Sequence, residues 1–335
     1  MNLNIPYLET DNKLLNDAYR IAAGDIVGNI VYYQNGLLTE EKPCMIAGLD
    51  YNTPWTRDTA INIWNALSIL SPEVSKNTLL AVLEEEEGSI YIGGQYWDSS
   101  IWMIGAREYC RFHKDDNFYR LAFEAGRNSV HRLEEDEFDE EDGLFRGPAV
   151  YGDGIADERQ TALIRENTHI CAHGIPCVWP TFWRYECLGG YGRHSGTIWP
   201  HIQGFWARAM HRAGHQESFE KELYLMAQKA VRDMHFSEIY HPDTGALYGG
   251  MQEQGPGGIV EWDSRRKQTW SATAFLALIY FEILGLTMED GEPVFHPQMP
   301  INCGHMRIRG FEVAGWLFDL DIDGKEVSVR KRKIS

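Results

Sequence analysis

Apolar residues recur at intervals of three and four along most of the chain, which is the period of an α-helix with one buried face. In 12–31, leucine, isoleucine and alanine fall along one side of such a helix. The segment 268–285 contains TWSATAFLALIYFEIL, which is apolar all round and predicts a deeply buried helix. Helices are predicted over 12–31, from Thr53-Pro54 to Leu70, and over 74–85, 96–113, 116–133, 158–167, 197–213, 216–235 and 268–285.

Long connections rich in glycine, tryptophan and tyrosine separate these helices, at 86–95, 134–157, 168–196 and 237–267. Connections in compact domains are usually short, and longer ones are often functional. We therefore expect a helical scaffold that carries its chemistry on ordered loops at one end.

The pattern changes after Gly285. The segment HMRIRGFEVAGWLFDLDIDGKEVSVRKRKI alternates apolar and polar residues and contains an Asp-Gly turn, which predicts short β-strands. The expected organisation is a helical catalytic domain over 1–286 with a β-rich appendage over 287–335 packed on it.

The net charge of −18 argues against a nucleic-acid partner, because phosphates require a basic face. It also argues against binding to anionic membrane surfaces, whereas a neutral sugar is unaffected by it. Aromatic residues make up 12% of the chain, which suits sugar stacking and a large core equally well.

The six cysteines contain no Cys-x-x-Cys pair, so isolated thiols are favoured over a zinc site, and we expect neither a metal nor a cofactor. The first residues show no basic region followed by an apolar run, and no stretch approaches ~18 apolar residues. These features predict a cytoplasmic protein.

The sequence PWTRDTA at 54–60 is the first candidate for chemistry. A guanidinium fork at Arg57 and the carboxylate of Asp58 could together bind two vicinal hydroxyls, beside the ring of Trp55. The alternative is structural, because an acidic residue in the first turn of a helix favours the helix dipole.

Two further segments carry candidate carboxylates. In DGLFRGPAVYGDG, Asp153 lies between two glycines, where it is a candidate acid or part of a simple turn. In ALYGGMQEQGPGG, Glu253 precedes Trp270 by seventeen residues, and Glu261 precedes it by nine. Either glutamate could instead be a solvated loop residue.

Two other segments are rich in polar and aromatic side chains. QYWDSSIWMIGA contains Trp97 and Asp98 at a helix start, where they could contact hydroxyls or cap the helix. YGRHSGTIWPHIQGFWA contains Arg193, His194 and Trp199, which could line a site, although the tryptophan could equally belong to the core.

Taken in order, these segments resemble the six-hairpin glycosidases, among them the glucoamylase, glycogen-debranching and processing-glucosidase families. The resemblance implies an all-α fold, the (α/α) toroid. It also implies that Arg57 and Asp58 hold a terminal sugar, that Asp153 is the general acid, and that Glu253 activates water, with Glu261 as its competitor.

The sequence departs from that pattern in two places. Arg193 stands where debranching-type enzymes have tyrosine. A full toroid has twelve helices, whereas about nine are predicted here, and the shortage lies after Asp153. An incomplete toroid would expose apolar helix faces, which a second copy of the chain could cover.

The expected function is therefore an exo-acting, inverting glycoside hydrolase of α-glucosidase type, acting on an oligosaccharide or small glycoside. One alternative is a phosphorylase on the same scaffold, for which Arg265, Arg266 and Lys267 form the only basic cluster near the candidate base. Another is a shortened domain that binds sugar without cleaving it.

Overall fold

The computed structural model describes residues 3–95, 98–145, 170–324 and 326–334. Its helices of at least seven residues are α1 (Lys13–Gly28), α2 (Thr56–Asn62), α4 (Pro72–Ala81), α5 (Asp98–Phe112), α6 (Asp116–Glu137), α9 (Pro200–Arg212), α10 (Gln216–Asp233) and α11 (Thr269–Ala277). The shorter helical segments are η1 (Ile63–Leu67), α3 (Ser68–Leu70), η2 (Ile170–His173), α8 (Trp183–Glu186), η3 (Gly255–Gly257) and η4 (Leu278–Ile283).

The strands are more numerous than the sequence predicted. A four-stranded antiparallel sheet contains β1 (Tyr7–Thr10), β12 (Met306–Val313), β13 (Trp316–Asp323) and β14 (Glu326–Lys333), in that order. The other strands form antiparallel pairs: β2 (Ile30–Tyr33) with β3 (Lys42–Met45), β4 (Leu83–Glu86) with β5 (Ser89–Ile92), β6 (Phe138–Asp139) with β7 (Leu144–Phe145), β8 (Met251–Glu253) with β9 (Ile259–Glu261), and β10 (Leu286–Glu289) with β11 (Glu292–Phe295).

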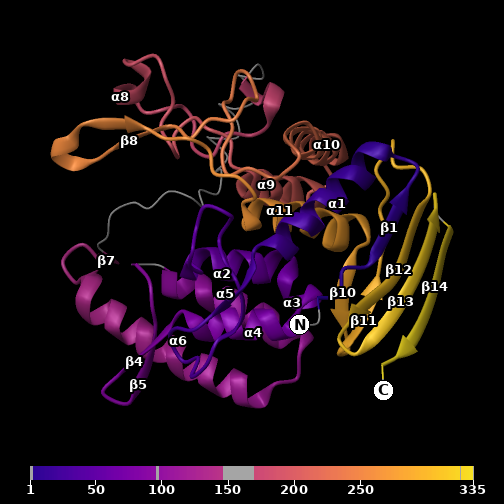
Figure 1. The fold of residues 1–335 in the computed structure, drawn as a ribbon, viewed down its shortest axis with the longest axis horizontal. Helices are drawn as coiled ribbons and strands as arrows, with labels where there is room; N and C mark the ends of the chain where they lie inside the picture. Colours follow the sequence, from indigo (N-terminus) through magenta and orange to yellow (C-terminus); the bar gives the residue numbers. More distant parts are fainter. Residues whose placement is uncertain (1–2, 96–97, 146–169, 325, 335) are drawn as a thin grey trace.

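The predicted all-α toroid is therefore wrong, and the fold is mixed α and β. The sheet stands to one side of the helices, and the pair β8–β9 projects with α8 from the opposite side (Figure 1). The strands that the sequence did not predict are two to four residues long, and β5 to β9 lie in connections that were predicted as loops. Strands β2 and β4 overlap the ends of the predicted helices 12–31 and 74–85, which are wrong there. So short a strand shows too few alternating positions to be recognised.

The β-rich C-terminal region was predicted correctly, but its sheet also takes a strand from the N-terminus. Strand β1 pairs with β12, so that Leu8 stands opposite Ile308. Buried residues of α1, α11 and β12 belong to one continuous hydrophobic core. The division at residue 286 stays a prediction.

The predicted helices over 12–31, 116–133, 197–213 and 216–235 are confirmed as α1, α6, α9 and α10. The helix predicted from Thr53 begins at Thr56, because Trp55 still has an extended backbone (φ −87°, ψ 142°). The predicted helix 158–167 lies outside the described residues. None of the described helices combines the length and apolar character needed to cross a membrane.

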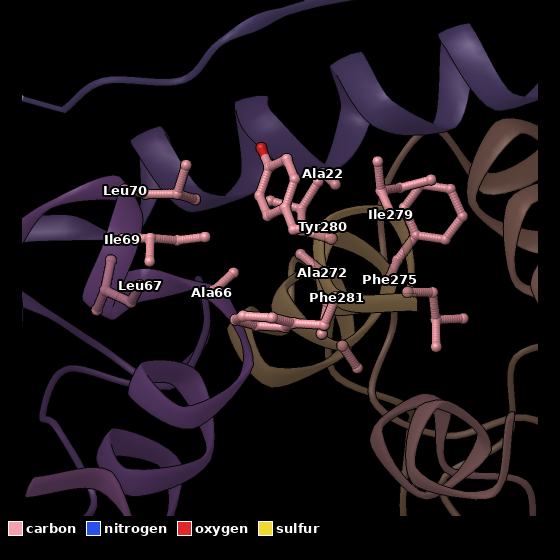
Figure 2. Close-up of a cluster of buried hydrophobic side chains, with 14 of the residues drawn as sticks. Ala22, Ala66, Leu67, Ile69, Leu70, Ala272, Phe275, Ile279, Tyr280 and Phe281 are labelled. Carbon is pink, nitrogen blue, oxygen red and sulfur yellow. The ribbon is translucent and has the colours of Figure 1, made fainter. Parts of the chain in front are cut away.

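Helix α11 and its continuation η4 are buried on all sides, as their apolar sequence predicted. Figure 2 shows Phe275, Ile279 and Tyr280 from this segment among Ala22 of α1 and Leu70 of α3. The Tyr280 hydroxyl in this cluster is satisfied, because its oxygen lies 2.8 Å from the hydroxyl of Tyr19.

Two aromatic side chains of α6 remain exposed, Tyr119 at 60% and Phe123 at 65%, and Ile104 of α5 is exposed at 40%. An uncovered apolar helix face was expected from the shortage of helices. That a second copy of the chain covers it stays a prediction.

Close contact between α2 and α5 depends on Gly105. A Cβ atom added there would lie 2.7 Å from the Cα atom of Ala60, so the helices would have to separate. We expect Gly105→Ala to lower the free energy of unfolding by about 2 kcal/mol, as overpacking typically does. The measurement is the urea midpoint, with the slope checked for two-state behaviour.

Gly24 of α1 provides the matched control, because an added Cβ atom there would meet nothing within 4 Å. Gly24→Ala should raise the free energy of unfolding by about 0.5–1 kcal/mol through helix propensity. Equal stability of the two variants would show that the α2–α5 contact is not tight.

Candidate functional site

The N-terminal ends of α2, α5, α9 and α11 meet at one end of the helical part. Arg57 of α2 bonds Asp98 of α5, and Gln268, just before α11, bonds Asp58 of α2. His201 of α9 stacks on Trp270 of α11, with ring centroids 4.1 Å apart. The starts of four helices thus surround one small region.

The Arg57–Asp98 pair is the best-defined feature of this region. The Arg57 Nε atom donates to Asp98 Oδ1 at 3.0 Å, and the side chains are 19% and 5% exposed. The second Asp98 oxygen accepts from the backbone N–H of Gln95 at 3.0 Å. Two residues that the sequence placed in separate motifs are therefore brought together as a largely buried ion pair.

Asp58 lies beside this pair and is also buried. Its Oδ1 atom accepts from the Gln268 side-chain amide at 3.3 Å. Trp55, immediately before α2, is 49% exposed, so its ring has a face available to a ligand. The predicted Trp-Thr-Arg-Asp segment therefore supplies two buried polar groups and an accessible aromatic ring.

Trp199 packs against the segment that contains Arg193 and His194. It is 1% exposed, its ring stacks on His194 at 4.6 Å between centroids, and its Nε1 atom donates to the backbone oxygen of Arg193 at 2.7 Å. Of the two readings of this residue, wall or core, its burial favours core. It holds the Arg193–His194 segment in position.

Arg193 belongs to a buried network that the sequence did not reveal. Its guanidinium donates to Glu238 at 2.8 Å and to the backbone oxygen of Gly249 at 3.2 Å. The Tyr51 hydroxyl donates to the other Glu238 oxygen at 2.9 Å. Burial, followed by the charge of Glu238, raises the pKa of Tyr51, which stays a neutral donor.

Glu238 is 3% exposed, and the only sign of it in the sequence was an acidic residue between the apolar side chains of HFSEIY. A charge in such a segment usually has a buried partner. That partner, Arg193, is far away in sequence, so the pairing could not have been anticipated.

His194 is neutral at physiological pH. Desolvation of its ring and the charges of Arg193, His201 and Arg57 lower its pKa to about 3. The charges of Arg57 and Arg193 therefore both act on this imidazole.

This shift makes a prediction about stability. An unfolded histidine binds a proton below about pH 6.5, whereas His194 in the folded chain does not, so stability is lost as the pH falls from 6.5 toward 3. Between pH 7 and pH 4.5 we expect His194 to account for about 2 kcal/mol of lost unfolding free energy. The measurement is urea unfolding of wild type and His194→Gln at both pH values.

The difference between the two proteins isolates this residue. His113 and His235, whose pKa values burial also lowers, are present in both and cancel. The same loss of stability in wild type and His194→Gln would contradict the assignment.

Several buried polar atoms in this region have no hydrogen-bond partner among the residues that the structure describes. They are Gln268 Oε1, Trp270 Nε1, Trp262 Nε1 and His194 Nδ1. Buried polar groups are almost always hydrogen-bonded, so a cluster of unsatisfied ones needs an explanation. Donors and acceptors together in one place suit a ligand that carries hydroxyl groups.

Of the three candidate catalytic carboxylates, the structure describes Glu253 and Glu261. Asp153 and Trp97 lie outside the described residues. Glu253 and Glu261 are exposed on the β8–β9 hairpin, where Glu261 stands opposite Met251. Glu253, two residues further along β8, therefore points to the same face, and its carboxylate lies 3.5 Å from the Arg184 guanidinium.

The hairpin adjoins the Arg193 segment, because the backbone N–H of Arg193 donates to the oxygen of Met251 at 2.7 Å. Within the described part of the chain, no group of three or more histidine, cysteine, aspartate or glutamate residues is arranged to hold a metal ion.

Comparison with known proteins identifies no matching family model. A search of curated proteins also finds no match.

Solved structures do match the fold. A structure named as a sialidase aligns over 98% of this chain and 40% of its own, with 11% identity and a TM-score of 0.54. A GH78 family rhamnosidase of Bacillus sp. GL1 aligns over 99% of this chain and 42% of its own, with 12% identity and a TM-score of 0.59. The chain thus has the fold of a region of proteins named as glycosidases, and it spans about two fifths of their length.

Proposed function

We propose that this chain is an exo-acting glycoside hydrolase that holds a neutral terminal sugar between the N-terminal ends of α2, α5, α9 and α11. The observation that carries the proposal is the largely buried Arg57–Asp98 pair beside buried polar atoms that have no hydrogen-bond partner within the described parts of the chain. The glycosidase names of the two structures with a similar fold agree with it.

The chemistry of the site suits a neutral ligand. Arg57 and Arg193 are balanced by Asp98 and Glu238, and Asp58 adds a further carboxylate. An anionic sugar would therefore meet no excess positive charge. Vicinal hydroxyls can donate to a carboxylate and accept from a guanidinium at the same time, which favours a polyhydroxylated ligand.

For the reaction we propose inversion, with Asp153 as general acid and Glu253 as the carboxylate that activates water. In inverting glycosidases the two carboxyl groups lie ~6.5–9.5 Å apart, which leaves room for a water molecule. Glu261, on the same face of the hairpin, is the alternative base. Arg57, Asp58 and Asp98 would hold the sugar while the bond is broken.

The proposal is tested by incubating the full chain with p-nitrophenyl α-glucoside, α-rhamnoside and α-mannoside and measuring release of nitrophenol. We expect one of them to be cleaved in phosphate-free buffer, and Asp98→Asn to lose that activity. Cleavage only with added phosphate would indicate a phosphorylase. Calorimetric binding of the sugars without cleavage would indicate a sugar-binding domain.

A further inference from the structure

A cavity lies on the other side of the segment that holds Asp98. It has a volume of about 600 Å³ and is bounded by the β4–β5 hairpin, the start of α5 and the end of α6. Cavities of this size are typical of small-molecule sites. Ser99, at the start of α5, lines it, and Asp98, the preceding residue, binds Arg57.

The wall between the two sites is the segment Gly93–Gly94. A Cβ atom on Gly93 would lie 2.5 Å from Oε1 of Glu84, which lines the cavity. A Cβ atom on Gly94, whose φ is +121°, would lie 2.8 Å from Oδ2 of Asp98. Gly93 therefore packs against a carboxylate that lines the cavity, and Gly94 packs against the carboxylate that binds Arg57. A single backbone segment without side chains separates the two carboxylates.

The two sites also share consecutive residues of α5. Asp98 binds Arg57 on one side, whereas Ser99 lines the cavity. Ser99 is 7% exposed, and its buried hydroxyl has no partner among the residues that the structure describes. A buried hydroxyl without a partner is costly, so this atom points to a ligand.

The charged side chains that line the cavity disfavour an anionic ligand. Glu84, Asp136 and Glu137 line it. Arg132, the one guanidinium among the described lining residues, is bound to Glu86 at 2.6 Å and lies 3.4 Å from the centroid of the Tyr91 ring. The excess of negative charge repels phosphates and uronic acids. Carboxylates that are not grouped as metal ligands accept hydrogen bonds from hydroxyl groups.

We propose that this cavity is a second sugar subsite, which binds an uncharged unit of the same oligosaccharide whose terminal unit is held by Arg57 and Asp98. The inference rests on the proposed function, and it makes the preferred substrate an oligosaccharide rather than a small glycoside. Glu84, Asp136 and Ser99 are the residues that would contact the second unit.

The test uses the double variant Glu84→Gln/Asp136→Asn and the single variant Ser99→Ala. Glu84 and Asp136 are exposed, so their replacement should not affect folding. The quantity measured is kcat/KM for the α-linked tetrasaccharide divided by kcat/KM for the p-nitrophenyl glycoside of the same sugar. We expect this ratio to fall about 10-fold in the double variant and less in Ser99→Ala, because hydrogen bonds to charged groups contribute most.

The matched control is Glu85→Gln/Glu134→Gln, which removes two exposed carboxylates from the same hairpin and helix that do not line the cavity. Its ratio should equal that of the wild type. An unchanged ratio in the Glu84/Asp136 variant, or an equal fall in the control, would overturn the subsite.

If the wild type cleaves no glycoside, the hydrolase proposal fails and the subsite is tested by calorimetry with maltotetraose. Weaker binding by the Glu84/Asp136 variant than by the wild type and the control would support it. Equal affinities, no binding by the wild type, or a stoichiometry of two tetrasaccharides per chain would overturn it.

Discussion

Replacing Arg57 with lysine is expected to lower kcat/KM for an accepted glycoside by at least about 100-fold. Lysine keeps the charge but lacks the planar fork with which Arg57 binds Asp98 and, in the proposed function, would bind sugar hydroxyls at the same time. The loss of two hydrogen bonds to charged groups, at ~1.5–3 kcal/mol each, accounts for this magnitude. The measurement is kcat/KM together with the melting temperature of each protein.

A surface ion pair provides the control. Arg20 donates to Asp17 at 2.8 Å, but its side chain is 68% exposed, so Arg20→Lys should change neither activity nor stability measurably. Retention of activity in Arg57→Lys would contradict the proposal that the Arg57–Asp98 pair binds the sugar. A large fall in melting temperature would instead assign the loss to folding, because a buried Asp98 without its partner is destabilising.

The second large effect on activity is expected from replacing the two proposed catalytic carboxylates, Asp153 and Glu253. Asp153→Asn is expected to lower kcat by 10²–10⁴-fold, approximately the contribution of general acid catalysis, while sugar binding is kept. Glu253→Gln should lower kcat at least about 100-fold, because no carboxylate would then activate water. The measurement is single-turnover cleavage with calorimetric binding of the product sugar.

Glu261→Gln is the matched control for Glu253, because both side chains lie on one face of the β8–β9 hairpin. If Glu261→Gln is inactive and Glu253→Gln is active, the base is Glu261. Near-wild-type turnover in Asp153→Asn, or in both glutamine variants together, would contradict a mechanism with these carboxylates.

The longer helices were predictable from sequence because each repeats its apolar period over several turns. The buried character of 268–285 followed directly from its composition, and the structure places it at the centre of the core (Figure 2). The sequence predicted only part of the four-stranded sheet. The alternation after Gly285 predicted β12, β13 and β14, but β1 has four residues and pairs with a strand almost three hundred residues away.

The site was predictable where a local motif carried it. Arg57, Asp98 and His194 could be proposed as candidates because each stands in a segment of unusual composition, although nothing in the sequence showed that Arg57 pairs with Asp98. Gln268 and Glu238 were missed, because their importance comes from burial and from partners that are distant in sequence. Such pairings arise from tertiary structure and leave no local periodicity.

The most direct test of the proposed function is a proton NMR time course of wild-type chain with the accepted α-glycoside in phosphate-free buffer. We predict that the first sugar released is the β-anomer and that the α-anomer appears later through mutarotation, as inversion requires. Release of the α-anomer first would contradict inversion. Absence of any free sugar, with binding intact, would contradict the hydrolase itself.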